Sequence, residues 1–163
     1  MVSKPLATLV RLLPKRLMVK VNPAKGTLKK PQTFNSRAHY RQHIEKFNGY
    51  AKFSPMMFDL FSQHSIKRTA NQQFELVFPK EWEAHNYTQP PNIMNKLAKL
   101  PLPIAAIRGK PSIFFSEKMW QQWKKLKPTQ SFLEDLNYGH LIPLESPTRC
   151  AQLIGEAVSA CHK

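Results

Sequence analysis

The last 65 residues alternate between strand-like and helix-like patterns, and this order constrains the fold more than any other feature of the chain. A short apolar run over 103–107 is suited to a buried parallel strand, and the helix after it can begin at the cap residue Ser116. A second strand is predicted over 131–136, and Ser146 precedes a proline that suits the first position of a final helix. Strands and helices in this order are typical of parallel β-α-β units. We therefore predict an α/β fold with two parallel strands and flanking helices.

Both predicted helices of this part carry an apolar stripe at helical spacing. The first stripe consists of Met119, Trp120, Trp123 and Leu126. The second stripe consists of Cys150, Leu153, Ile154, Ala157 and Val158. We expect the second stripe to face the sheet, because the apolar side of a surface helix is the side that it buries.

The first 98 residues have a different pattern, a series of short aromatic-rich helices. One helix is predicted from Ser36, and a second begins at Ser54, a cap residue that is followed by proline. A third helix start is predicted after Pro79. We therefore divide the chain into a mostly helical region over 1–98 and a strand-helix region over 99–163.

The beginning of the chain is strongly basic. Ten Lys or Arg residues and no acid precede Glu45, and the whole chain has a formal net charge of +15. Residues 1–20 have a helical pattern that Pro14 interrupts, and 22–32 is predicted to be a loop. Such an arm is typical of a nucleic-acid-binding tail, of an organelle transit peptide, or simply of a solvated basic surface. Because no aromatic residue precedes Phe34 to stack on bases, we predict no specific nucleic-acid site.

Composition and cysteine content are those of a globular chain. Of the 163 residues, 42% are hydrophobic, as expected for a chain with a packed core. The longest apolar stretch, 100–107, is far shorter than the roughly 20 residues that cross a bilayer, so no membrane span is predicted. Cys150 and Cys161 lie too far apart along one predicted helix to form a disulfide. We expect a reducing compartment, the cytoplasm, and no zinc cluster.

The segment around His140 carries the most specific motif of the chain. It reads Tyr138-Gly139-His140-Leu141-Ile142-Pro143-Leu144-Glu145-Ser146-Pro147. This segment resembles the histidine loop of the α/β-hydrolase family, in which a Gly-His pair follows the last strand and a proline-containing turn leads into the final helix. The upstream segment Ile104-Ala105-Ala106-Ile107-Arg108-Gly109 is similar to the penultimate strand of that family and its exit glycine. The resemblance implies the C-terminal part of an α/β-hydrolase fold, and the first 98 residues resemble, less specifically, the helical lid.

The resemblance implies that His140 is a catalytic general base. A histidine at the C-terminal edge of a parallel sheet lies where ligands bind in open α/β folds. Gly139 allows a turn that a side chain would obstruct, and an imidazole can take a proton from a nucleophile and return it to a leaving group. The alternative is a structural loop histidine. The resemblance also implies a small apolar substrate, such as an ester, an epoxide or a compound with a carbon–halogen bond, and no cofactor.

The resemblance further implies a catalytic acid and a set of substrate-binding residues. The loop after Gly109 contains no carboxylate, so the nearest candidate for the acid is Glu117. Alternatively, Glu117 is only a carboxylate that the first turn of a helix favours. Apolar residues of the lid are candidates to line an acyl or aromatic pocket, and packing of the lid is the alternative role. The candidate substrate-binding residues are Met57, Phe58, Phe61, Trp82 and Leu141.

The nucleophile motif of the family is absent from this sequence. The five glycines, at positions 26, 49, 109, 139 and 155, never stand four apart, so no Gly-x-Ser-x-Gly motif is present. The same spacing excludes a dinucleotide fingerprint and a phosphate-binding loop. His39 and His43 stand four apart, but no third ligand is spaced to complete a metal site. We therefore expect an N-terminal hydrolase half on a further segment or a partner chain, or self-association of this chain.

Two functions from different classes remain open. The first is a hydrolase part that contributes His140 as general base and is inactive by itself. The second is a basic, non-enzymatic module that binds a polyanion or a protein partner and reuses a hydrolase remnant. The first function requires a nucleophile on another segment, and the second requires a salt-sensitive affinity for polyanions.

Overall fold

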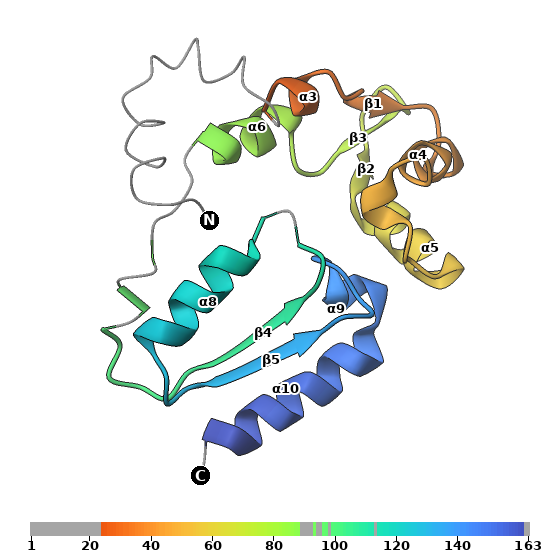
Figure 1. Ribbon diagram of the computed structural model, residues 1–163. Coiled ribbons are helices and arrows are strands. Elements are labelled where there is room, and N and C mark those ends of the chain that lie inside the picture. Colours follow the sequence, from red (N-terminus) through yellow and green to blue (C-terminus); the bar gives the residue numbers. More distant parts are fainter. Residues whose placement is uncertain (1–23, 89–92, 94–95, 98, 113, 162–163) are drawn as a thin grey trace. The chain divides into compact units, whose positions relative to one another are not determined.

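The computed structural model describes residues 24–88, 93, 96–97, 99–112 and 114–161 (Figure 1). The chain divides into two compact units. We call Asn92–Lys163 the strand-helix unit and Val2–Pro91 the aromatic unit, and each is described by itself. The sequence had placed the division after residue 98. The helical pattern of residues 1–20 lies outside the described residues.

Two parallel strands form the centre of the strand-helix unit, as predicted. Strand β4 (Ala105–Gly109) pairs with β5 (Ser131–Asp135), with Ala105 opposite Ser131 and Gly109 opposite Asp135. The first strand begins two residues later than the predicted 103–107, because the backbone N–H of Ile104 donates to the Gln130 side chain instead of joining the ladder. The helices of this unit are α8 (Glu117–Leu126), α9 (Ile142–Glu145) and α10 (Pro147–Cys161).

Helices α8 and α10 lie on opposite sides of the strand pair (Figure 1). Ser116 caps α8 as predicted, since its Oγ accepts the N–H of Met119 at 3.4 Å. Trp120 of α8 is buried, with its ring edge-to-face against Phe132 of β5 at 5.1 Å between centroids. Aromatic burial of this kind dominates the energy of a small core.

The stripe predicted for the last helix is only partly buried. Leu153 and Ala157 of α10 are buried, whereas Ile154 and Val158 are each about half exposed. Residues four apart share one helix face, and a neighbour in sequence is rotated by about 100° from that face. The expectation that all five stripe residues face the sheet was therefore too broad.

The aromatic unit contains short helices, as predicted, and also a small sheet that the sequence did not indicate. Strands β1 (Thr33–Phe34), β3 (Phe74–Leu76) and β2 (Ile66–Arg68) form an antiparallel sheet in that order. Its helical elements are α3 (Ala24–Leu28), α4 (Arg37–Ile44), η1 (Asn48–Tyr50), α5 (Pro55–His64) and α6 (Lys80–Thr88). Each strand has only two or three residues, which is too short for an alternating pattern to identify it.

The cap predicted at Ser54 is present, and Ser36, from which a helix was predicted, is a cap as well, but one predicted loop contains a helix. Ser36 Oγ accepts the N–H of His39 at 3.0 Å, and Ser54 Oγ accepts the N–H of Met57 at 3.2 Å. Helix α3 lies inside the predicted loop 22–32, where it buries Thr27. It packs against α6, and tertiary packing of this kind overrides the weak local propensity of a Gly- and Pro-containing stretch.

The core of the aromatic unit is a set of rings around the small sheet. Phe34 is almost fully buried, and its ring meets that of Tyr40 at 4.8 Å between centroids. Ile44 and Ile66 complete the buried cluster. Among the described helices, none combines the length and the apolar character that a membrane crossing requires.

Candidate active site

The candidate site lies at the C-terminal ends of the two parallel strands, where the loop after β4 meets the loop after β5. We call residues 136–141 the histidine loop. Gly109, the last residue of β4, allows the histidine loop to approach this strand closely. A side-chain carbon on Gly109 would overlap the carbonyl oxygen of Gly139 and would lie 2.6 Å from that of Tyr138. Only glycine fits this position without displacement of the histidine loop.

Glu145 holds the histidine loop from the other side. One of its carboxylate oxygens, Oε1, accepts the backbone N–H of Leu141 at 3.2 Å, and the other accepts that of Gly139. These two amides flank His140, so a single carboxylate fixes the backbone on both sides of the imidazole. Hydrogen bonds to a charged acceptor are stronger than those between neutral groups. The sequence pattern indicated no role for Glu145, although this residue lies within the motif.

His140 contacts the loop that follows β4. Its Nδ1 lies 3.1 Å from the Oγ of Ser112, and its ring lies 4.8 Å from that of Phe114 between centroids. The side chain remains exposed on its other side. Partial burial lowers the pKa of His140, because water is withdrawn from the charged form, and the nearby Glu145 carboxylate opposes this effect. At neutral pH His140 is therefore mainly a neutral imidazole, the form that can accept a proton.

Ser112 occupies the loop in which the resemblance expects the catalytic acid. Its Oγ accepts the N–H of Phe115 at 3.1 Å, and the same oxygen contacts Nδ1 of His140. A hydroxyl oxygen has two lone pairs and one proton, so it can accept the Nδ1–H of His140 while it holds the Phe115 amide. The sequence showed that this loop lacks a carboxylate, but nothing in it indicated that a serine takes the contact.

The structure does not bring Glu117, the predicted acid, to His140. Its carboxylate accepts from Gln121 at 2.7 Å and pairs with Arg108, and Lys110 lies 3.3 Å away. The hydrogen bond from Gln121, followed by that from Arg108, lowers the pKa of Glu117 to about 2. Among the described residues, the hydrogen-bond partner of the His140 ring is Ser112.

Arg108 is a buried cation at the base of the site. Its guanidinium pairs with both Glu117 and Glu134 and lies over the ring of Trp120, 4.6 Å from the centroid. Buried charges are expected to be paired, and a cation over an indole face is a favourable arrangement. No sequence pattern indicated this role, since Arg108 stood out only as the last residue before Gly109.

A cavity of about 410 Å³ adjoins His140. It is mostly apolar, and its lining includes Ser112, Phe114, Trp120, Ile142 and Pro143. Leu141, predicted to bind substrate, does not line it. In the part of the chain that the structure describes, no group of three His, Cys, Asp or Glu side chains can hold a metal ion.

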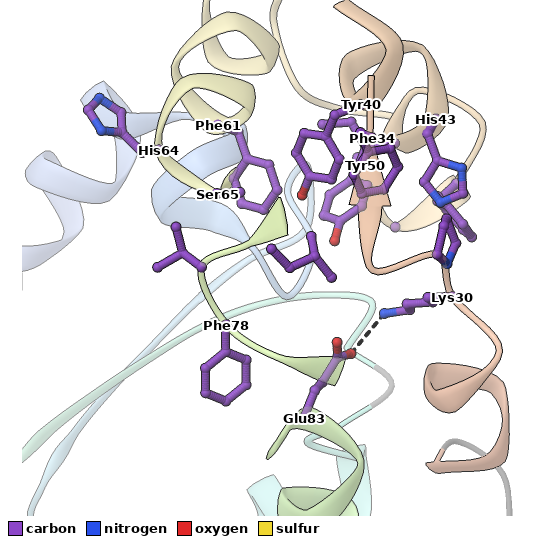
Figure 2. A pocket seen from close by; sticks show the side chains of 16 residues that line it. Lys30, Phe34, Tyr40, His43, Tyr50, Phe61, His64, Ser65, Phe78 and Glu83 are labelled. Carbon is purple, nitrogen blue, oxygen red and sulfur yellow. Dashed lines mark hydrogen bonds and ion pairs between the residues drawn. The ribbon is translucent and has the colours of Figure 1, made fainter. Parts of the chain in front are cut away.

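A second, larger cavity lies within the aromatic unit (Figure 2). Of the lid residues predicted to bind substrate, Phe61 lines it and the other three do not. Met57 is buried on α5, and Phe58 packs against Phe53 at 5.5 Å between ring centroids. Trp82 is 65% exposed on α6. Of the four candidates from this unit, Phe61 thus contributes to the wall of this cavity, and Met57, Phe58 and Trp82 do not.

The paired strands, the covering helices and the histidine loop together give the fold of the C-terminal part of an α/β-hydrolase. No protein-family model matches the sequence, and no curated protein matches it. Solved structures do match, and the chain spans about half the length of these proteins.

Three of these structures illustrate the likeness. An E-2-(acetamidomethylene)succinate hydrolase is 10% identical with a TM-score of 0.73, over 91% of this chain and 54% of that one. An M. tuberculosis esterase is 11% identical with a TM-score of 0.66, over 96% of this chain and 52% of that one. A peroxisomal alpha-beta-hydrolase from Saccharomyces cerevisiae is 15% identical with a TM-score of 0.59, over 93% of this chain and 41% of that one.

Proposed function

We propose that His140 is the general base of an α/β-hydrolase-type active site that hydrolyses a small apolar ester, epoxide or similar substrate. The observation that carries the proposal is the contact between His140 Nδ1 and Ser112 Oγ at 3.1 Å, at the C-terminal edge of the parallel strands. This contact orients the ring from one nitrogen and leaves the other nitrogen, Nε2, for proton transfer. The apolar cavity beside the ring suits an apolar substrate.

The proposed proton transfer needs one particular tautomer of His140. Nδ1–H donates to Ser112, and the Nε2 lone pair takes the proton of the attacking hydroxyl group or water. The resulting imidazolium then returns that proton to the departing alkoxide, so the histidine is unchanged after one turnover. Glu145 serves as a positioning residue, since it fixes the amides on both sides of the imidazole.

Ser112 differs from a carboxylate in one important respect, because it is neutral. A carboxylate orients the imidazole and also stabilises its protonated form, whereas a hydroxyl only orients it. In a serine protease triad, replacement of the acid by a neutral amide lowers kcat by about 10⁴-fold because the amide favours the wrong tautomer. A hydroxyl that accepts Nδ1–H avoids that part of the loss, but it does not supply the negative charge. We therefore expect a weak general base in this site, unless a carboxylate from another segment approaches the ring.

The tautomer of His140 tests the proposal directly. Nitrogen-15 NMR of the full chain shows which ring nitrogen carries the proton, and we expect Nδ1–H at neutral pH. The variant S112D places a carboxylate at the same contact, and it should raise the pKa of His140 and keep the proton on Nδ1. The variant S112A should leave the two tautomers mixed. A wild-type ring with its proton on Nε2 would overturn the assignment of His140 as the base.

The nucleophile is assigned to another segment, because this sequence contains no Gly-x-Ser-x-Gly motif. The chain by itself should hydrolyse 4-nitrophenyl butyrate no faster than the buffer does, and the variant H140A should not differ from it. Turnover that the wild-type chain shows and H140A loses would mean that the chain carries its own nucleophile.

Charge favours a second function, binding to a polyanion. The formal net charge of +15 predicts weak and sequence-independent affinity for DNA. In this case the affinity should fall steeply as the salt concentration rises. Binding that persists at high salt, or that prefers one sequence, would favour the non-enzymatic function over the hydrolase function.

A further inference from the structure

The cavity of the aromatic unit is a second candidate site, and it shares no lining residue with the cavity beside His140. Its volume is about 520 Å³, and its lining residues all lie between Lys30 and Glu83. Six Phe or Tyr rings line it, among them Phe34 against Tyr40 at 4.8 Å and Tyr50 against Phe61 at 5.4 Å between centroids. A wall of rings in a cavity of this size suits a planar apolar ligand.

The polar end of this cavity is built around Glu83. Its Oε1 accepts a hydrogen bond from the Nζ of Lys30 at 2.8 Å. The same oxygen accepts from the hydroxyl groups of Tyr87 at 3.4 Å and Thr27 at 3.5 Å. All three of these contacts use the same oxygen. Within the described part of the chain, no hydrogen bond uses Oε2 of Glu83. One half of a partly buried carboxylate is thus available as an acceptor.

A donor faces the same end of the cavity. Figure 2 shows the hydroxyl groups of Tyr40 and Tyr50 on the side of their rings that is turned toward Lys30 and Glu83. Ser65 lies beside the Tyr40 hydroxyl, whereas no hydrogen bond among the described residues uses that of Tyr50. Burial, followed by the Glu83 charge, raises the pKa of Tyr50, so this phenol keeps its proton at neutral pH. Tyr50 is therefore a donor that lacks an acceptor among these residues.

We propose that this cavity binds a neutral aromatic alcohol. Its ring lies among Phe34, Tyr50 and Phe61, and its hydroxyl accepts from Tyr50 and donates to Oε2 of Glu83. A hydroxyl both donates and accepts, so it satisfies both groups at once. Lys30 and Glu83 neutralise each other at this end, so a carboxylate or an ammonium group would gain no net attraction there to offset the loss of its own hydration. Neutral alcohols are thus favoured over both charged classes. This inference does not depend on His140.

Binding of four probes to the full chain tests the ligand class. The probes are 2-naphthol, naphthalene, 2-naphthoate and 2-naphthylmethylammonium, measured by equilibrium dialysis at neutral pH. We expect 2-naphthol to bind about tenfold more tightly than naphthalene, which corresponds to the net gain from hydrogen bonds at the hydroxyl. The variant Y50F removes only the phenolic oxygen and should abolish this preference. The variant E83Q keeps an oxygen for Lys30 and places an NH2 donor where Oε2 was, so it should weaken binding of 2-naphthol and leave binding of naphthalene unchanged.

Two control variants show whether the probes bind in this cavity or elsewhere on the chain. The variant W82A changes an exposed ring that does not line the cavity, and it should bind 2-naphthol like the wild-type chain. The variant H140A should also bind normally, so failure of the proposed hydrolase function would leave this result intact. Equal affinity for naphthalene and 2-naphthol, tighter binding of either charged probe, or no binding of any probe would overturn the proposal. So would a preference for 2-naphthol that both Y50F and E83Q retain.

Discussion

The two units of this chain hold their candidate sites by different physical means. In the strand-helix unit, His140 is positioned by backbone contacts, the close approach at Gly109 and the carboxylate of Glu145. In the aromatic unit, the cavity is formed by ring contacts, such as those of Phe34 with Tyr40. Proton transfer requires one imidazole in one orientation, whereas binding of a planar ligand requires walls of the right shape. The difference in construction therefore matches a difference in the proposed roles.

The units also differ in where their buried charge lies. Arg108 of the strand-helix unit is a buried cation between two carboxylates and the ring of Trp120. In the aromatic unit, the Lys30–Glu83 pair is only partly buried and borders the cavity. A paired, buried charge contributes to the structure around it, and a half-satisfied pair at a cavity is available to a ligand.

The largest predicted effect is a loss of stability on replacement of Trp120 in the strand-helix unit, compared with replacement of Trp82 in the aromatic unit. Trp120 is 1% exposed and packs against Phe115, Trp123 and Phe132, so Trp120→Ala should lower the free energy of unfolding by about 3–5 kcal/mol. Its indole N–H has no hydrogen-bond partner among the described residues, which favours the lower end of this range. Denaturant unfolding gives the size of the change, and amide hydrogen exchange shows in which unit protection is lost.

Trp82→Ala is the matched control, because Trp82 is 65% exposed in the aromatic unit. It should change the free energy of unfolding by no more than about 0.5 kcal/mol. Equal losses for the two variants would contradict the assignment of Trp120 to the core of its unit.

A smaller effect is predicted for a pair of glycines in the strand-helix unit. Gly109→Ala forces the histidine loop away from β4 and should cost about 1–3 kcal/mol. Gly155 lies on α10 with open space around the added carbon, so Gly155→Ala should stabilise the chain by up to about 1 kcal/mol. Thermal or denaturant unfolding should show a lower stability for Gly109→Ala and a higher stability for Gly155→Ala. A neutral Gly109→Ala would show that the two loops are not in close contact.

The sequence predicted those parts of the fold that depend on local rules. The caps at Ser54 and Ser116 follow from one side chain and the amide three residues later, and both are present. Both parallel strands follow from short apolar runs, and the hydrolase-like fold follows from the order of elements together with the motif around His140. These signals are contained in short stretches of the chain.

The remaining features depend on contacts between distant residues. Ser112 and His140 are 28 positions apart, and Lys30 and Glu83 are 53 apart, so no local pattern joins them. Helix α3 forms in a stretch predicted to be a loop, because α6 packs against it. The catalytic acid was assigned to Glu117 from its place in the sequence. Only the structure shows that the Glu117 carboxylate pairs with Arg108 and Lys110.

The smallest predicted effect compares one histidine in each unit. Burial lowers the pKa of both His140 and His43, and the positive charge of Lys46 adds to the effect at His43. Between each lowered pKa and the unfolded value of about 6.5, the unfolded chain binds more protons than the folded one. The stability that each neutral imidazole contributes is therefore complete above about pH 6.5, and it decreases as the pH falls through the folded pKa. Acid should thus weaken both units slightly.

The variants H140Q and H43Q remove these titrations one at a time. Each should lose less stability than the wild-type chain between about pH 7.5 and pH 5.5, when unfolding is followed with a denaturant. Amide hydrogen exchange should place the change in the strand-helix unit for H140Q and in the aromatic unit for H43Q. Partial exposure of both rings keeps the effects small, since water screens the charged form. A steeper loss of stability in acid for either variant would mean that its histidine gains a proton more easily in the folded chain, in contradiction to burial as the dominant cause.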